Sequence, residues 1–162
     1  MTAVLTIGLS AAVAHADTVT FTLSNPTQSI SGQAGGIATY IVTATASASN
    51  GAAVFLNGDS FNVGAPLTLD DSDFFAESPL SMAPGEVDTF DMFAITVPAG
   101  TTLGNYSGFF TVLGGADGNA NDTLGTVNFV TVVTPEPGSF ILLGTGLSGL
   151  VGIVRRKQFR KR

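Results

Sequence analysis

Apolar and polar residues alternate along most of the chain from residue 17 to residue 134. In the first such segment Val19, Phe21 and Leu23 fall on one side and threonines on the other, which is the two-residue period of a half-buried β-strand. Segments of the same kind are residues 18–23, 37–45, 87–97, 106–113 and 126–133. Shorter strands are marked by Phe55, Phe61 and the pair Leu67 and Leu69. We find no convincing amphipathic helix of three turns, so the pattern predicts an all-β domain.

The alternation changes phase once, inside the segment 87–97. Phe90 and Met92 share one face of this segment, whereas Phe93, Ile95 and Val97 share the other. A slip of one residue moves every later side chain to the opposite face of a sheet. The sequence therefore predicts a β-bulge, or a strand that changes sheets, between Met92 and Phe93.

Turn-forming pairs such as Asn-Gly, Pro-Gly and Gly-Gly separate the predicted strands at short intervals. This spacing is typical of an antiparallel β-sandwich, for which we expect about seven to nine strands. The stretch from Pro84-Gly85 to Tyr106-Ser107-Gly108 resembles bacterial immunoglobulin-like domains. The resemblance implies that the Tyr106 hydroxyl binds backbone at a corner of the sandwich. A jelly roll is the alternative architecture.

The C-terminal 28 residues, 135–162, differ in character from the rest. All six lysine and arginine residues lie in the last eight positions, after an apolar run at 140–154 and a preceding motif, Pro135-Glu136-Pro137. This order of parts resembles the PEP-CTERM sorting signal of Gram-negative bacteria. The resemblance implies recognition and processing by an exosortase-type membrane protease near the Pro-Glu-Pro motif. It also implies export across the inner membrane alongside exopolysaccharide, to the cell surface or the medium.

The apolar run predicts one hydrophobic C-terminal helix. Fifteen residues make a helix of about 22 Å, whereas a bilayer core of about 30 Å needs roughly 20 apolar residues. Arg155, Arg156 and Lys157 follow the run directly and would hold its end on the cytoplasmic side of the inner membrane. The helix is thus predicted to be a transient or permanent anchor. An ordinary single-pass anchor is the alternative to a sorting signal.

Residues 1–16 read as a signal peptide. An apolar stretch ends in Ala14-His15-Ala16, the small-x-small pattern that signal peptidase cleaves, and Asp17 would begin the mature chain. The usual basic start of a signal peptide is missing, which a truncated N-terminus would explain. A buried N-terminal helix or strand is the alternative. The sequence then divides into a signal peptide at 1–16, a β-sandwich at 17–134 and a sorting segment at 135–162.

The predicted sandwich is acidic. Of the 12 acidic residues only Glu136 lies outside it, which leaves 11 carboxylates in residues 17–134 and no lysine, arginine or histidine. Such a domain is not expected to bind nucleic acid. The chain also has no cysteine, which excludes disulfides, thiol catalysis and cysteine metal sites.

Oxygen-bearing side chains recur at alternate positions in one predicted loop, at Asp117, Asn119, Asn121 and Asp122. Calcium prefers six to eight oxygen ligands, so this loop is a candidate calcium site, although it lacks the distant glutamate of an EF-hand. A polar hairpin tip, with Asp-Gly and asparagine supplying positive φ, is the alternative. The run Asp70-Asp71-Ser72-Asp73 is a second calcium candidate because its three carboxylates repel one another.

Catalysis has few residues to use. The single histidine, His15, lies in the predicted signal peptide, and a carboxylate pair from residues 70–77 is more readily explained as a solvated loop. Carbohydrate binding would need exposed aromatics, for which Phe74-Phe75 is the loop candidate, but hydrophobic packing is the favoured interpretation of this doublet. Phe109-Phe110 is read as one core and one opposite-face residue. We therefore expect a non-enzymatic surface or matrix protein, with a calcium-dependent adhesin or an anchored carbohydrate-binding module as the alternative.

Overall fold

A computed structural model describes residues 17–135, 138 and 142–146 of the chain. Nine strands and one helix, followed by a helical turn at 142–146, form in this part. Their bounds are β1 (Val19–Leu23), β2 (Thr27–Ser31), β3 (Gly36–Ala46), β4 (Val54–Val63), β5 (Thr68–Asp70), α1 (Ser72–Glu77), β6 (Ser81–Met82), β7 (Val87–Val97), β8 (Gly104–Gly115) and β9 (Asp122–Thr134). The predicted all-β class and strand number are confirmed.

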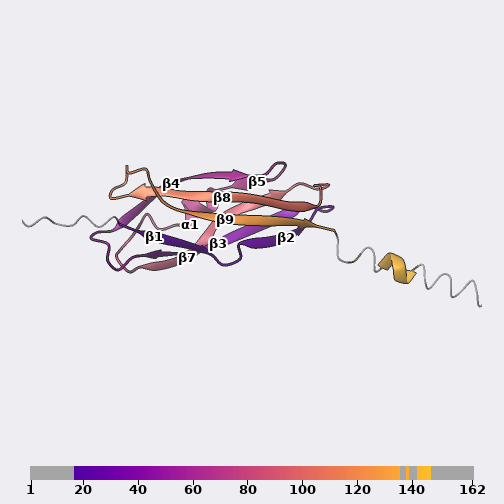
Figure 1. Ribbon diagram of the computed structural model, residues 1–162, viewed down its shortest axis with the longest axis horizontal. Coiled ribbons are helices and arrows are strands. Elements are labelled where there is room, and N and C mark those ends of the chain that lie inside the picture. Colours follow the sequence, from indigo (N-terminus) through magenta and orange to yellow (C-terminus); the bar gives the residue numbers. More distant parts are fainter. Residues whose placement is uncertain (1–16, 136–137, 139–141, 147–162) are drawn as a thin grey trace, which may run out of the picture.

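The strands form two packed sheets, elongated along the strand direction (Figure 1). One sheet has the order β1-β3-β7-β5 and the other the order β2-β9-β8-β4-β6. The series β1-β3-β7-β5 and β9-β8-β4 reproduce the A-B-E-D and G-F-C orders of an immunoglobulin-like sandwich, which decides against the jelly roll. One pair departs from the antiparallel expectation, since β2 runs parallel to β9.

The predicted bulge is present in β7. Tyr40 of β3 pairs with Phe93, and the next residue, Ile41, pairs with Asp91, so Met92 is the extra residue of the bulged strand. Because of this insertion both Met92 and Phe93 are fully buried, although they are neighbours in sequence. The change of phase in the sequence therefore reports a bulge within one sheet, not a change of sheets.

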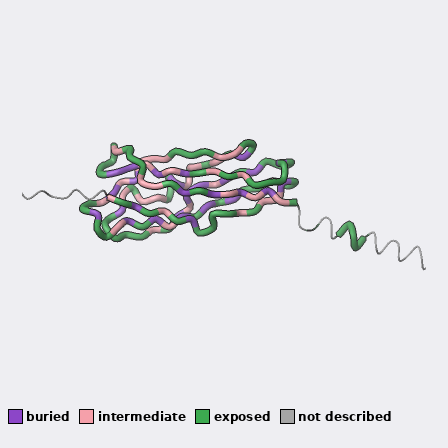
Figure 2. The backbone as a smooth tube through the Cα atoms, in the orientation of Figure 1, coloured by how far each residue is buried: buried purple, intermediate pink, exposed green. Residues whose placement is uncertain are grey.

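Aromatic side chains fill the space between the two sheets, and Figure 2 shows buried residues recurring along the strands. The Phe93 ring stacks on Tyr40 at 4.9 Å and on Phe110 at 5.1 Å, and it meets Phe129 at 4.8 Å between ring centroids. All four side chains are essentially inaccessible to solvent. The Tyr40 hydroxyl also joins the sheets, because it lies 2.9 Å from Thr131 Oγ1 on β9 and donates to the Val130 carbonyl at 3.1 Å.

The predicted corner tyrosine is confirmed. Tyr106 lies near the start of β8, and its hydroxyl donates to the Thr102 carbonyl, four residues earlier, at 2.9 Å. This bond ties the loop between β7 and β8 to the strand that follows it.

Three elements differ from the sequence-based expectation. Phe55 and Phe61, taken as marks of separate short strands, belong to the single strand β4, whose pattern is interrupted by a bulge between Leu56 and Gly58. β2 has no apolar alternation, because it is a polar edge strand in which only Ile30 packs against the core. The helix α1 is too short to show a helical period, and it ends just before Pro79, which disfavours helical backbone at its preceding residue.

Candidate functional site

The sandwich is complete at the residue before the Pro-Glu-Pro motif. Thr134 is the last residue of β9 and pairs with Ser31 of β2. Its carbonyl accepts the Gly32 amide at 3.0 Å, and its hydroxyl donates to the Ile30 carbonyl at 3.4 Å. Pro135 follows and is exposed. A cut beyond Thr134 would therefore remove no strand pairing from the sandwich.

The other residues predicted for sorting lie outside the described part of the chain, namely Glu136, Pro137, Arg155, Arg156 and Lys157. Of the predicted C-terminal helix, the turn at 142–146 is described, and its side chains are exposed. Within residues 17–135, 138 and 142–146, no helix has both the length and the apolar character needed to cross a bilayer.

The sandwich has two distinct poles. Residue 17 enters at one end and β9 leaves at the other (Figure 1). At the entry pole the buried Asn50 amide holds Thr18, since Nδ2 donates to the Thr18 carbonyl at 3.0 Å and Oδ1 accepts the Thr18 amide at 2.9 Å. Asp17 is fastened as well, because its Oδ1 accepts the Gly51 amide at 3.1 Å. The predicted signal peptide, 1–16, lies outside the described residues and stays a prediction.

The candidate calcium loop joins β8 to β9 at the pole away from Pro135. Asp117 Oδ1 accepts the Asn119 amide at 2.8 Å, and Asn57 Nδ2 donates to the carbonyls of Asp117 and Ala120, both at 2.8 Å. Asn57 is the extra residue of the β4 bulge, so that bulge directs its amide into the loop. These contacts are typical of a polar hairpin tip, and among the predicted calcium ligands they engage one side-chain oxygen, Asp117 Oδ1.

Two further facts bear on calcium. The positive φ of the β8–β9 hairpin lies at Gly115, and no described residue other than glycine has a positive φ, so the expected asparagine and Asp-Gly conformations are wrong. Across the described ranges, no three His, Cys, Asp or Glu side chains are grouped closely enough to hold a metal ion. Calcium at Asp117, Asn119, Asn121 and Asp122 stays a prediction, which a higher melting temperature in millimolar calcium would support.

The second acidic run, residues 70–73, leads into α1. Asp70 Oδ1 accepts the Ser72 amide at 3.0 Å, and this bond lowers the pKa of Asp70. The pKa of Asp73 is raised by partial burial and then by the charges of Glu77, Asp91 and Asp70. The run is thus a set of mutually repelling carboxylates around a short helix.

Asp59 is a carboxylate that the sequence did not single out. It faces Val112, which is fully buried, in the β4–β8 register, so its side chain lies on the core side of the sheet. Its Oδ2 is buried and has no hydrogen-bond partner in the described structure. Burial and then the charge of Asp71 raise its pKa to about 6. The β4 bulge turns Asp59 inward, and an undetected bulge is why the sequence pattern did not reveal this residue.

Of the candidate aromatic doublet Phe74-Phe75, one ring packs in the core and the other is exposed. Phe74 lies on α1 and is buried against Phe110 at 5.7 Å between ring centroids, which leaves only Phe75 exposed. Phe109 and Phe110 behave as expected, with Phe110 in the core and Phe109 40% exposed on the opposite face. The exposed Phe109 therefore offers an aromatic surface on a sheet, whereas the sequence-based candidate, Phe74-Phe75, was expected in a loop.

Comparisons with known proteins identify the tail. The family model for the PEP-CTERM protein-sorting motif matches residues 133–158. No curated protein matches the chain. A similar solved structure is native alpha-2-macroglobulin from Escherichia coli, from domain MG7 to the C-terminus, at 19% identity and a TM-score of 0.48. The match covers 74% of this chain and 17% of that chain, and the fold assignment above rests on strand order instead.

Fold and tail together define a β-sandwich with a C-terminal sorting signal. The segment 133–158 is a PEP-CTERM sorting motif, so the predicted resemblance is confirmed over this part of the chain. The motif marks the protein for exosortase-dependent sorting, with export and C-terminal membrane anchoring.

Proposed function

We propose that this chain is a non-enzymatic surface or extracellular-matrix protein of a Gram-negative bacterium. An exosortase-type protease of the inner membrane recognises Pro135, Glu136 and Pro137 and releases or transfers the sandwich to the outside, among exopolysaccharide or in a biofilm. The observation that carries the proposal is the sorting motif at 133–158, which begins in the last two residues of the last strand.

The structure supports this role through the junction between the two parts. Since strand pairing ends at Thr134, the tail can be cut or held without strain on the sandwich. The basic residues, which would attract phospholipid headgroups, are all in the tail, whereas the sandwich is acidic throughout. The tail therefore suits the membrane, and the sandwich suits the aqueous exterior.

A non-enzymatic role is supported by the residue types of residues 17–134. Serine and threonine lack a histidine, lysine or arginine partner there, so no activated nucleophile of the usual kind can be built. Asp59 and Asp71 interact as charges, but Asp59 Oδ2 is buried, away from a substrate.

Intact mass of the protein recovered from cells and medium tests the sorting proposal. Wild type should lose the predicted signal peptide and a C-terminal fragment, and Glu136→Ala should retain the tail in the membrane fraction. Asp88→Asn, a carboxylate change on β7, is the matched control and should be processed normally. Normal processing of Glu136→Ala would contradict the proposal. An intact tail on wild-type protein would favour the permanently anchored adhesin or binding module.

A further inference from the structure

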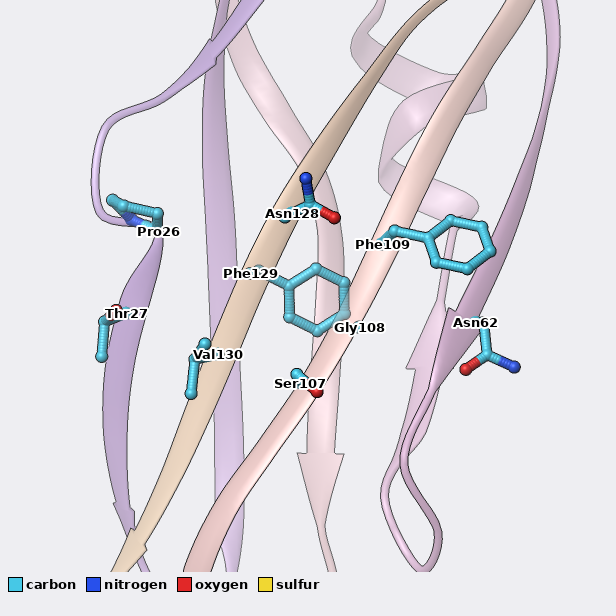
Figure 3. Close-up of a pocket in the computed structure, with 9 residues that line it drawn as sticks. All are labelled: Pro26, Thr27, Asn62, Ser107, Gly108, Phe109, Asn128, Phe129 and Val130. Carbon is cyan, nitrogen blue, oxygen red and sulfur yellow. The ribbon is translucent and has the colours of Figure 1, made fainter.

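A groove of about 340 Å³ lies on the outer face of the five-stranded sheet. It extends from β2 across β9 and β8 to β4, on the side of the sheet away from the core (Figure 3). Its volume is in the range of small-molecule sites, about 300 to 1,000 Å³. Neither the sorting motif nor the acidic loops contribute to it.

Strand register arranges the groove residues in two rows across the sheet. One row is Asn62, Phe109 and Asn128, which are direct partners on β4, β8 and β9. The other row is Ser107, Val130 and Thr27, on β8, β9 and β2. Strands are about 4.8 Å apart, so a groove that crosses four of them is about 14 Å long, which suits a short extended chain lying across the strands.

The first row combines an aromatic ring with two amides. Phe109 is 40% exposed, and Asn62 and Asn128 flank it on the neighbouring strands (Figure 3). The side-chain amides of Asn62 and Asn128 make no hydrogen bond with the described part of the protein. By contrast, the side-chain amides of Asn50 and Asn57 bind backbone groups. Each amide can donate and accept, so the pair is available to a ligand that carries hydroxyl groups.

The Phe129 ring packs directly against Gly108 at the floor of the groove. A Cβ at Gly108 would collide with the Phe129 ring and would lie 2.5 Å from the Asn62 carbonyl. The buried Phe129 ring therefore occupies the space that a side chain at position 108 would need (Figure 3). A preformed floor reduces the ordering cost of binding.

Charge selects the class of ligand. None of the residues that line the groove is charged, although residues 17–134 contain 11 carboxylates. An ionic ligand would find no counter-charge here, and a polyanion would be repelled by the acidic domain. A peptide that adds a strand would use a sheet edge, whereas this groove crosses the face of the sheet.

We propose that this groove binds a neutral carbohydrate chain that lies across the strands. One sugar ring stacks its C–H face on Phe109, and its hydroxyls bind the amides of Asn62 and Asn128. Hydroxyls of Ser107 and Thr27 contact a neighbouring sugar unit. This activity does not depend on how the tail is processed.

The test uses the full-length chain in detergent on an array of neutral oligosaccharides, with uronic-acid oligosaccharides as charged probes. Variants are Phe109→Ala and Asn128→Ala, and the matched control is Phe75→Ala, the exposed phenylalanine of α1. Melting temperature is measured for each variant. If Phe109→Ala fails to fold, Asn62→Ala and Asn128→Ala decide the matter, since both positions are exposed.

Wild type and Phe75→Ala should bind at least one neutral oligosaccharide with equal affinity. Loss of ring stacking should weaken binding about tenfold in Phe109→Ala, and each amide variant should lose a similar factor. The proposal is overturned by no retention on any neutral oligosaccharide, by a preference for uronic acids, or by equal binding of all variants. It is also overturned if Phe109→Ala abolishes self-association in sedimentation while leaving sugar binding intact.

Discussion

Two polar groups inside this sandwich, Tyr40 at its centre and Asp59 at its flank, have opposite surroundings. The Tyr40 hydroxyl is buried between the sheets and contacts both Thr131 Oγ1 and the Val130 carbonyl. The Asp59 carboxylate has a buried oxygen without a partner and faces the charge of Asp71. A buried polar group stabilises a fold when it is satisfied and costs free energy when it is not. We therefore expect the centre to hold the sandwich together and the flank to weaken it near neutral pH.

The largest effect is expected at the centre, from Phe93→Ala. The Phe93 ring contacts three other aromatic rings, so its removal leaves a cavity that the surrounding strands cannot fill. We expect a loss of about 3 to 5 kcal/mol in the free energy of unfolding, measured with urea. A loss below about 2 kcal/mol would show that the aromatic stack does not dominate the core.

Tyr40→Phe isolates the polar contribution of the same region. The substitution keeps the ring but leaves the buried Thr131 hydroxyl without its Tyr40 partner. We expect a loss of about 1 to 3 kcal/mol, measured by urea unfolding. Burial raises the pKa of Tyr40, so the hydroxyl stays protonated in mildly alkaline buffers and the loss should not vary with pH there. A loss under about 0.5 kcal/mol would show that the Tyr40 hydroxyl does not stabilise the fold, and the contrast with Asp59 would fail.

Asp59→Asn should raise the free energy of unfolding, whereas Phe93→Ala and Tyr40→Phe lower it. The pKa of Asp59 is about 6 in the folded protein and 3.8 for an ordinary aspartate, so the folded state holds a proton more tightly. The stability linked to that proton is full below about pH 4, falls as the pH rises toward 6, and is absent above it. The side chain is half-buried, so we expect Asp59→Asn to stabilise the protein by about 1 to 2 kcal/mol at pH 7.5 after allowance for solvent screening.

Urea unfolding between pH 4 and pH 7.5 checks this linkage. The gain of Asp59→Asn over wild type should grow with pH across that interval. A gain that is constant from pH 4 to pH 7.5 would show that the amide acts through packing and that the carboxylate does not titrate as described.

Much of the fold was predictable from alternation. The bulge at Met92 was visible because each of its flanks is rich in large apolar residues, so the change of phase was clear. The β4 bulge was not visible, because Asn57, Gly58 and Asp59 carry no apolar phase to compare. That bulge sends Asn57 into the hairpin loop and Asp59 toward the core, so missing it concealed both roles.

The tail and the groove also differ in how far the sequence alone could predict them. The sorting motif is contiguous, and its order of residue types can be read directly from the sequence. The groove brings together residues from four strands that span more than 100 positions, from Thr27 to Val130. Only strand order and register make Asn62, Phe109 and Asn128 neighbours, and one sequence does not specify either.

The smallest effect is expected from Tyr106→Phe, which is the same chemical change as Tyr40→Phe at the other tyrosine of the chain. The Tyr106 hydroxyl makes one hydrogen bond, to the Thr102 carbonyl, at an exposed position. Water can replace that donor, so we expect a loss of about 0.5 to 1 kcal/mol. Urea unfolding of both variants in one buffer gives the comparison directly. If Tyr106→Phe costs as much as Tyr40→Phe, the corner bond fixes the β7–β8 loop more strongly than its exposure suggests, and burial is not what separates the two tyrosines.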